Sequence, residues 1–288
     1  MSETQFIKNE IRIVGFNSVY YFEHGKEFYH PPEKHNTWEM LYVDKGKIIA
    51  ITDGIGCELE EGKAIFHEPN EIHTHISNKE VSNNMFVVSF TTHSPAMDFF
   101  KKKTFTLDKT SKTLLNLFMQ EAKNALGEIQ GDWNNRKKLK FNENEEFGST
   151  QLMASHLEEL FIKLIRSGGD KIHSSNESRK IAKNSTVESI ENYLKRSIYK
   201  NITFEDICKR FHLGKSQISL IFKECTGQSI MQYYTALKIK EAKKLLRDDS
   251  LSVSEITERL CYSGIHSFSR AFKMSTGFSP TGYKKSIT

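Results

Sequence analysis

The sequence contains few cysteines, and they are widely separated. The four residues Cys57, Cys208, Cys225 and Cys261 form no CxxC pair. Cysteine-based zinc sites and disulfide frameworks need closely spaced cysteines in a regular pattern. We therefore expect four reduced thiols and no zinc finger.

The sequence also lacks long apolar runs and the motifs of common enzymes. Its first residues show no charged segment followed by an apolar one, and no apolar stretch approaches the roughly 20 residues of a membrane-spanning helix. We expect no membrane partner and a cytoplasmic, nucleoid-associated location. Phosphate loops, nucleophile elbows and paired catalytic carboxylates are missing as well. We therefore expect no enzyme, no catalytic residue and no cofactor.

Positive charge is present, but only in the C-terminal third. Residues 184–288 contain 17 Lys and Arg and 10 Asp and Glu, a net charge of +7, whereas residues 1–183 carry a net charge of −2. Basic side chains displace the counterions that condense on a polyanion. The asymmetry indicates a polyanionic partner for this part of the chain alone.

Short apolar segments in the first ninety residues predict β-strands. They are rich in β-branched and aromatic residues, are separated by turn signals such as Asp53-Gly54 and Glu61-Gly62, and cover 11–14, 18–22, 38–43, 48–52, 64–66 and 85–90. Strands at this spacing are typical of an antiparallel barrel or sandwich. Helical periodicity follows at 114–126 and 152–165, separated by a polar loop at 131–149.

These patterns predict an α+β multidomain chain. We expect an antiparallel β-barrel at 1–105, a helical support or dimerisation unit at 106–167, a linker at 168–183 and an all-α domain at 184–288. The linker prediction rests on Gly168-Gly169 and a run of small polar residues. The second helix of the support unit either packs within its own chain or meets a second copy.

One pattern occurs twice in the last hundred residues. The segment from Phe222 to Tyr233 matches the segment from Phe272 to Tyr283 at an offset of fifty, with shared Phe, Lys, Thr, Gly, Ser and Tyr. Upstream, the offset is forty-nine, so the second copy has one extra residue between 262 and 267. Each copy predicts a helix, a tight turn at Gly214 or Gly264, and a second helix.

The repeat predicts two helix-turn-helix units joined by a continuous helix over 233–247. The exposed face of each second helix would read base edges in a major groove. These residues are Lys215, Ser216, Gln217, Ser219 and Leu220 in the first unit, and Ile265, His266, Ser267, Ser269 and Arg270 in the second. Lys223 and Lys273, one turn further on, are expected to contact phosphates.

These motifs resemble the AraC/XylS family of transcription regulators. The resemblance covers residues 184–285 and is most specific at Phe222-Lys…Thr226-Gly227 and at Ala271-Phe-Lys…Thr276-Gly277-Phe-Ser-Pro280. It implies seven helices, base reading by the third and sixth, double-stranded DNA and RNA polymerase as partners, and a homodimeric activator. Leu220 stands where many members have Arg, and Cys261-Tyr262 stands where Gly-Phe is usual.

The N-terminal region is similar to the cupin-like sensory domain of that family. The residues are His35-Asn-Thr-Trp-Glu39, Tyr42-Val-Asp-Lys-Gly46, Gly62 and Pro69-Asn-Glu-Ile-His73. The similarity implies a barrel that holds a small-molecule effector, such as a sugar or another polar metabolite. We expect the effector pocket to be lined by Trp38, Glu39, Tyr42, His35, His73 and His75.

Part of this set matches the spacing of metal-binding cupins. Glu33 stands where the first histidine is usual, while His35, Glu39 and His73 could still bind a divalent metal. We expect pocket groups without a metal, with the metal site as the alternative. The chain is accordingly interpreted as an effector-controlled, sequence-specific DNA-binding regulator. The rival interpretations are a metal-dependent cupin enzyme fused to a DNA-binding module and a ligand-independent DNA-binding protein.

Overall fold

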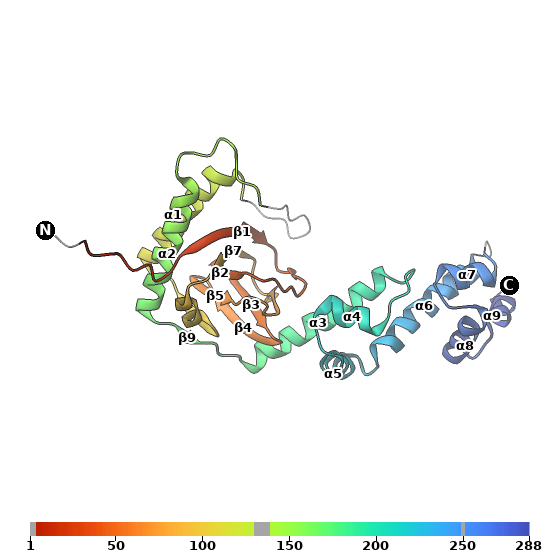
Figure 1. The fold of residues 1–288 in the computed structure, drawn as a ribbon. Helices are drawn as coiled ribbons and strands as arrows, with labels where there is room; N and C mark the ends of the chain where they lie inside the picture. Colours follow the sequence, from red (N-terminus) through yellow and green to blue (C-terminus); the bar gives the residue numbers. More distant parts are fainter. Residues whose placement is uncertain (1–3, 130–138, 249–250, 288) are drawn as a thin grey trace. The chain divides into compact units, whose positions relative to one another are not determined.

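The computed structural model describes residues 4–129, 139–248 and 251–287. The chain divides into two compact units, residues 1–182 and residues 183–288. Figure 1 shows that strands dominate the first unit and helices the second.

The first unit contains two antiparallel sheets. The larger has the order β1-β7-β2-β5-β8-β9, and the smaller has the order β4-β3-β6. The strands are β1 (Ile13–His24), β2 (Trp38–Lys45), β3 (Lys47–Thr52), β4 (Ile55–Glu60), β5 (Lys63–His67), β6 (His73–Ser77), β7 (Asn83–Thr92), β8 (Lys103–Thr106) and β9 (Asp170–Lys171). The predicted antiparallel, strand-rich fold of this unit is confirmed, with its described strands arranged in two sheets and no closed barrel assigned among them.

One apolar core joins the inner faces of these two sheets. Leu41 and Val43 of β2 belong to it together with Ile48 and Ala50 of β3. Successive side chains of a strand point to opposite faces of the sheet. The alternate residues of β2 therefore face away from this core, toward two helices.

The two helices α1 (Lys109–Leu126) and α2 (Ser149–Ser167) cover the outer face of the larger sheet. The Asp108 side chain accepts a hydrogen bond from the backbone of Ser111 and so begins α1. A second core packs Met153, Leu157 and Phe161 of α2 against this sheet. Intrachain packing therefore explains the apolar stripe of α2. Of the polar loop predicted at 131–149, residues 131–138 lie outside the described residues.

Helix α3 (Asn176–Arg196) begins inside the segment predicted as a linker. β9 occupies Asp170–Lys171, and the division between the two compact units, at residues 182–183, falls within the predicted segment 168–183. In the first unit, Ala182 packs in a small apolar cluster with Ile49, Ile51 and Ile76. The predicted linker lacked the apolar periodicity that marks a helix, because few positions of this part of α3 are buried.

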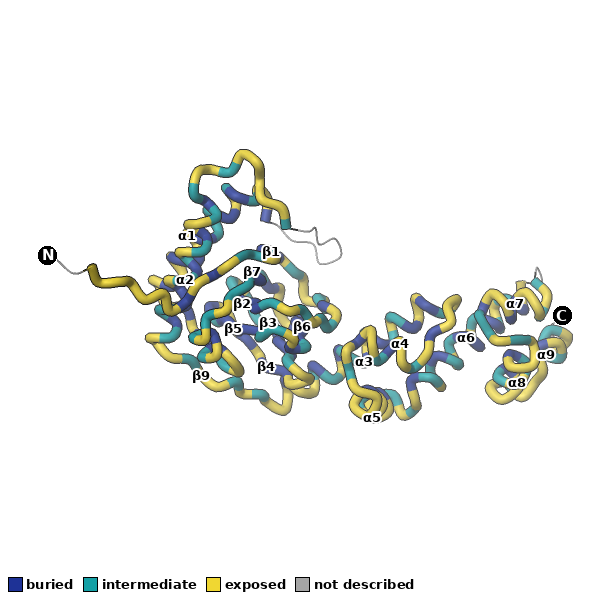
Figure 2. Tube along the Cα trace, viewed as in Figure 1, coloured by how far each residue is buried: buried dark blue, intermediate teal, exposed yellow. Residues whose placement is uncertain are grey.

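The second unit contains seven helices among its described residues. They are the end of α3, α4 (Phe204–Phe211), α5 (Lys215–Thr226), α6 (Ile230–Arg247), α7 (Val253–Arg259), α8 (Ile265–Thr276) and α9 (Pro280–Ile287). Two separate apolar cores lie along α6: Ile230 and Tyr234 belong to the first, and Ile239 and Leu246 to the second. Figure 2 shows α5 and α8 with long exposed stretches.

The described helices include none that combines the length and apolar character required to cross a membrane.

Candidate nucleic-acid interface and interior polar cluster

The first helix of each repeat begins with the same cap. Thr203 before α4 and Ser252 before α7 each accept a hydrogen bond from the backbone of the residue three positions on, and the carboxylates of Asp206 and Glu255 accept one from the backbone N–H of the cap. This capping box satisfies two backbone N–H groups that the helix leaves unpaired. α4 and α7 therefore begin at side-chain caps of the same kind.

The tight turns include Gly214 and Gly264 as predicted, but these glycines do not supply the left-handed backbone of the turns. Gly214 and Gly264 precede the second helices as N-caps in extended backbone, and no side chain caps α5 or α8. The left-handed positions are instead His212, with φ of 49°, and Cys261, with φ of 51°. Left-handed backbone is disfavoured for residues with a Cβ atom.

The residues that are identical in the two copies hold each unit together. Thr226 and Thr276 donate to the carbonyl oxygens of Phe222 and Phe272, both at 2.8 Å. The Phe222–Tyr233 and Phe272–Tyr283 ring pairs both have centroids 5.5 Å apart. Gly227 and Gly277 end α5 and α8 in left-handed backbone, which glycine adopts without strain. These shared residues of the repeated motif therefore stabilise the fold of each helix-turn-helix unit.

A buried lysine lies between the two cores of the second unit. Lys238 on α6 is only 6% exposed, and its Nζ donates to the carbonyl oxygens of Lys200 at 3.0 Å and Leu260 at 2.7 Å. Lys200 lies just before α4, and Leu260 ends α7. Burial lowers the pKa of Lys238. Sequence analysis missed this residue, although a charged side chain within the buried face of α6 was a visible signal.

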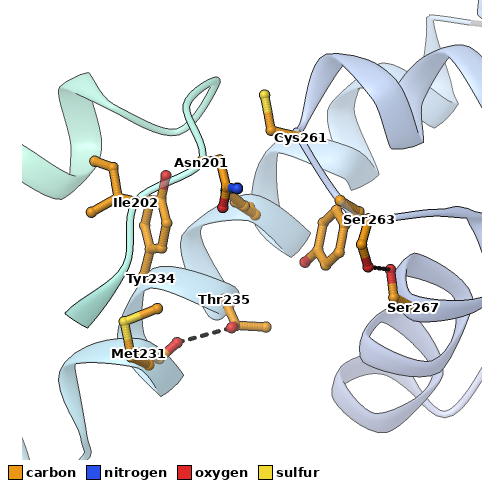
Figure 3. Close-up of a pocket in the computed structure, with 10 residues that line it drawn as sticks. Asn201, Ile202, Met231, Tyr234, Thr235, Cys261, Ser263 and Ser267 are labelled. Atoms are coloured by element: carbon orange, nitrogen blue, oxygen red, sulfur yellow. Dashed lines mark hydrogen bonds between the residues drawn. The ribbon is translucent and has the colours of Figure 1, made fainter. Parts of the chain in front are cut away.

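Other contacts join the same three elements. The Tyr234 hydroxyl donates to the carbonyl oxygens of Ser197 and Lys200, both at 2.7 Å, and the Cys261 thiol contacts the carbonyl oxygen of Tyr199. A cavity of about 500 Å³ lies beside them (Figure 3). The two helix-turn-helix units are thus held to α6 by polar contacts as well as by their cores.

A polar cluster lies at one end of the inner core of the first unit. Glu39 of β2 pairs across the sheet with His67 of β5 and with Ser89 of β7. His73 and His75 of β6 are buried on the opposing sheet, and the His67 and His75 Nε2 atoms are 3.2 Å apart. The structure therefore brings the predicted residues Glu39, His73 and His75 together, and it adds His67.

Glu33 and His35 join this cluster from the segment between β1 and β2. The backbones of Glu33 and His73 exchange two hydrogen bonds, at 2.9 and 3.0 Å. His35 Nε2 lies 3.3 Å from Glu39 Oε2. One ligand atom from each of Glu33, His35, Glu39 and His73 lies within 4.8 Å of every other. These residues fit the donor set of a divalent metal.

Charge and burial act against each other in this cluster. Burial alone would raise the pKa of Glu39, but the charge of His73 and a hydrogen bond from His35 outweigh it and hold this pKa well below its usual value. Burial alone would lower the pKa of His73, but the nearby Glu39 carboxylate raises it. Burial lowers the pKa of His67 well below its usual value and raises the pKa of Glu71 to about 7.

Trp38 and Tyr42 do not join the cluster. Both side chains belong to the core under α1 and α2, on the opposite face of β2 from Glu39. The strict alternation of a strand separates residues 38 and 42 from residue 39. The predicted pocket set is corrected accordingly.

Comparison with known proteins places the second unit in a family. Residues 207–286 match the family described as a helix-turn-helix domain. The Msm operon regulatory protein of Streptococcus mutans is 32% identical over 108 residues, which are 36% of this chain and 39% of that protein. The transcriptional activator RhaR of Mannheimia succiniciproducens is 35% identical over 100 residues, 35% of this chain and 36% of that protein.

The C-terminal unit is a helix-turn-helix domain of the AraC/XylS type. The matches span less than two fifths of these two relatives. Among solved structures, the C-terminal domain of AraT from Geobacillus stearothermophilus aligns with 35% of this chain and 84% of its own length, at 27% identity and a TM-score of 0.34.

The AraC-type domain leaves the predicted base-reading residues on its surface. In α5 all five are exposed, and the Leu220 side chain is 60% exposed. In α8 only Ser269 is half-buried, while Ser267 also donates to the Gly264 carbonyl oxygen at 2.8 Å. Lys223 and Lys273 are exposed one turn further on. Four of the five aligned positions on these exposed faces differ between the two copies, and Ser219 and Ser269 are the same.

Proposed function

We propose that this chain is a sequence-specific DNA-binding transcription regulator with two unequal base-reading helices. The observation that carries the proposal is the contrast between the two copies. Their framework residues make the same contacts in both, whereas their exposed faces differ. A repeat that preserves structure and varies its surface suits a protein that reads two different half-sites.

The chemistry of the two faces differs. α5 presents Lys215 and Gln217 beside the apolar Leu220, and α8 presents His266 and Arg270. Arginine binds guanine through two hydrogen bonds, whereas an apolar side chain contacts the thymine methyl group. We assign the stronger hydrogen-bonding readout to α8. α5 and α8 would enter adjacent major grooves, roughly 34 Å apart.

The helix starts and the net charge supply contacts with the DNA backbone. Because no side chain caps α5 or α8, the first backbone N–H groups of both helices are accessible to phosphate oxygens. Lys223 and Lys273 add charge close to each helix. The net charge of +7 over residues 184–288 supports the same partner.

In this proposal the first unit receives a small effector and the chain activates transcription with RNA polymerase, as a homodimer. The names of two relatives, an operon regulatory protein and a transcriptional activator, support regulation and activation. The buried polar cluster beside an apolar interior supports an effector site. Leu117 and Leu152 are exposed on α1 and α2 and offer apolar positions for a dimer contact.

The test is binding of the full chain to random and selected DNA in competition. We expect a preference of at least 10³-fold for a defined site over random sequence. Equal affinity for all sequences would contradict the proposal and favour an architectural DNA-binding protein.

A further inference from the structure

The interior cluster contains acceptor atoms that face one another. His73 Nε2 lies 3.4 Å from Glu39 Oε1 and 3.7 Å from Glu33 Oε1. Neither His73 Nε2 nor Glu39 Oε1 has a hydrogen-bond partner, although both side chains are at most 2% exposed. Buried polar atoms without a partner are costly, so this arrangement calls for a positive charge between them.

The protonation of His73 can be read from its other nitrogen. Nδ1 lies 3.1 Å from the carbonyl oxygen of Glu71, which can only accept a hydrogen bond. Nδ1 therefore carries a proton, and in the neutral ring the lone pair is on Nε2, which faces the two carboxylates. A backbone carbonyl that fixes the tautomer in this way is the usual support of a metal-binding histidine.

Other contacts orient the remaining donors. The Ser89 hydroxyl donates to Glu39 Oε2 at 2.8 Å, which leaves Oε1 directed toward His73. His35 Nδ1 lies 2.8 Å from the Thr37 hydroxyl, and its Nε2 faces Glu39. Glu33 and His35 are 21% and 26% exposed, in contrast to Glu39 and His73. An ion can therefore approach from the side of Glu33 and His35.

We propose that Glu33, His35, Glu39 and His73 bind one first-row divalent metal ion, of the Fe²⁺ or Mn²⁺ class, and that this ion is the effector. Two imidazole nitrogens and two carboxylates without sulfur suit such ions. The effector role of this ion rests on the proposed DNA-binding function, whereas the metal site itself does not. Bound metal would join the segment that carries Glu33 and His35 to β2 of one sheet and β6 of the other.

The test is titration of Mn²⁺ into chelator-treated full-length protein. Free Mn²⁺ is counted by electron paramagnetic resonance, and we expect one bound ion per chain. Glu39→Gln and Glu33→Gln keep the side-chain shape and should each weaken binding at least about 10-fold, as loss of a supporting contact already does at metal sites. Glu23→Gln, an exposed carboxylate on β1, is the matched control and should bind like the unaltered protein.

The affinity of the same proteins for a selected DNA site is then measured with and without Mn²⁺. We expect at least a 5-fold change in the unaltered protein and the Glu23→Gln variant, and none in Glu39→Gln. Absence of Mn²⁺ binding at millimolar concentration would overturn the metal site and leave a His73–Glu39 ion pair. Binding without a change in DNA affinity would overturn the effector role. No DNA binding in either state, with Mn²⁺ bound, would overturn the proposed function and retain the metal site.

Discussion

His212 and Cys261 occupy the same backbone position in the two repeats. Both end the first helix of their unit in left-handed backbone. The sequence alone indicated that Cys261 replaces a usual glycine, and the structure supplies the reason for that glycine. A side chain with a Cβ atom is strained in this conformation, by roughly 1–2 kcal/mol.

We therefore expect Cys261→Gly and His212→Gly each to raise the free energy of unfolding by up to about 1 kcal/mol. Urea unfolding followed by circular dichroism measures this free energy of unfolding. Cys225→Gly is the control, because Cys225 lies within α5 and glycine there should lower stability by about 1 kcal/mol. A loss of stability in Cys261→Gly would mean that the thiol contact with the Tyr199 carbonyl outweighs backbone strain.

The exposed side chains of α8 give the second residue-scale prediction. Arg270→Ala and His266→Ala should each cost about 1–3 kcal/mol on the preferred site and relax the preference at one or two base pairs. Lys223→Ala should weaken binding to all sequences equally and flatten its salt dependence. Fluorescence anisotropy on matched and mismatched duplexes measures both effects. Uniform losses for all three variants would show that the recognition face is elsewhere.

At the scale of elements, helices were easier to predict than strands. Helical periodicity and caps located α1, α2 and the helices of both repeats, because each carries an apolar face of many residues. β4, β6, β8 and β9 were not predicted, because polar or glycine residues interrupt or replace the apolar residues that mark a short strand. β6 is buried along its whole length, although it contains the polar residues His73, Thr74 and His75. Because of these polar residues, the sequence pattern did not indicate a buried strand here.

The candidate sites also differ in how far the sequence alone could predict them. The exposure of the proposed base-reading residues on α5 and α8 followed from the repeat, because helical geometry fixes which positions share a face. The grouping of Glu39, His67 and His73 depends on the pairing of strands from two sheets, and Lys238 depends on carbonyl groups distant in sequence. Contacts of that kind are set by tertiary structure, which the spacing of residues does not specify.

Helix α6 carries the element-scale prediction. Lys238→Met removes the ammonium group that joins Lys200 and Leu260, which takes the hydrogen bond from the Leu260 carbonyl oxygen and leaves that of Lys200 with Tyr234 alone, at a cost of about 1–3 kcal/mol. We expect the two recognition helices to lose their fixed separation, so that inserting one base pair between the half-sites weakens binding less than it does in the unaltered protein.

Affinity for a series of duplexes with altered half-site spacing measures this effect. Lys238→Arg should restore part of the spacing preference, and Lys240→Met, on the exposed side of α6, should retain all of it. An unchanged spacing preference in folded Lys238→Met would contradict a positioning role for this lysine.

At the scale of the whole molecule, the two units divide the proposed work. The AraC-type unit carries net positive charge and two proposed reading surfaces, and the sheet-rich unit carries a buried cluster of histidines and carboxylates with one partly exposed side. The exposed reading faces depend only on the second unit, whereas regulation requires both. The DNA-binding claim therefore comes first, because it can be tested without knowledge of the effector.

The most direct test of that claim is selection of DNA from a random library by the full-length chain. We predict a recovered site with two different short half-sites, centred one helical turn or about 10–10.5 base pairs apart. Repeating the selection with Arg270→Ala should alter the preference in one half-site and leave the other unchanged. Recovery of no common sequence, or of a site in which Arg270→Ala changes both halves equally, would contradict the account of two unequal readers.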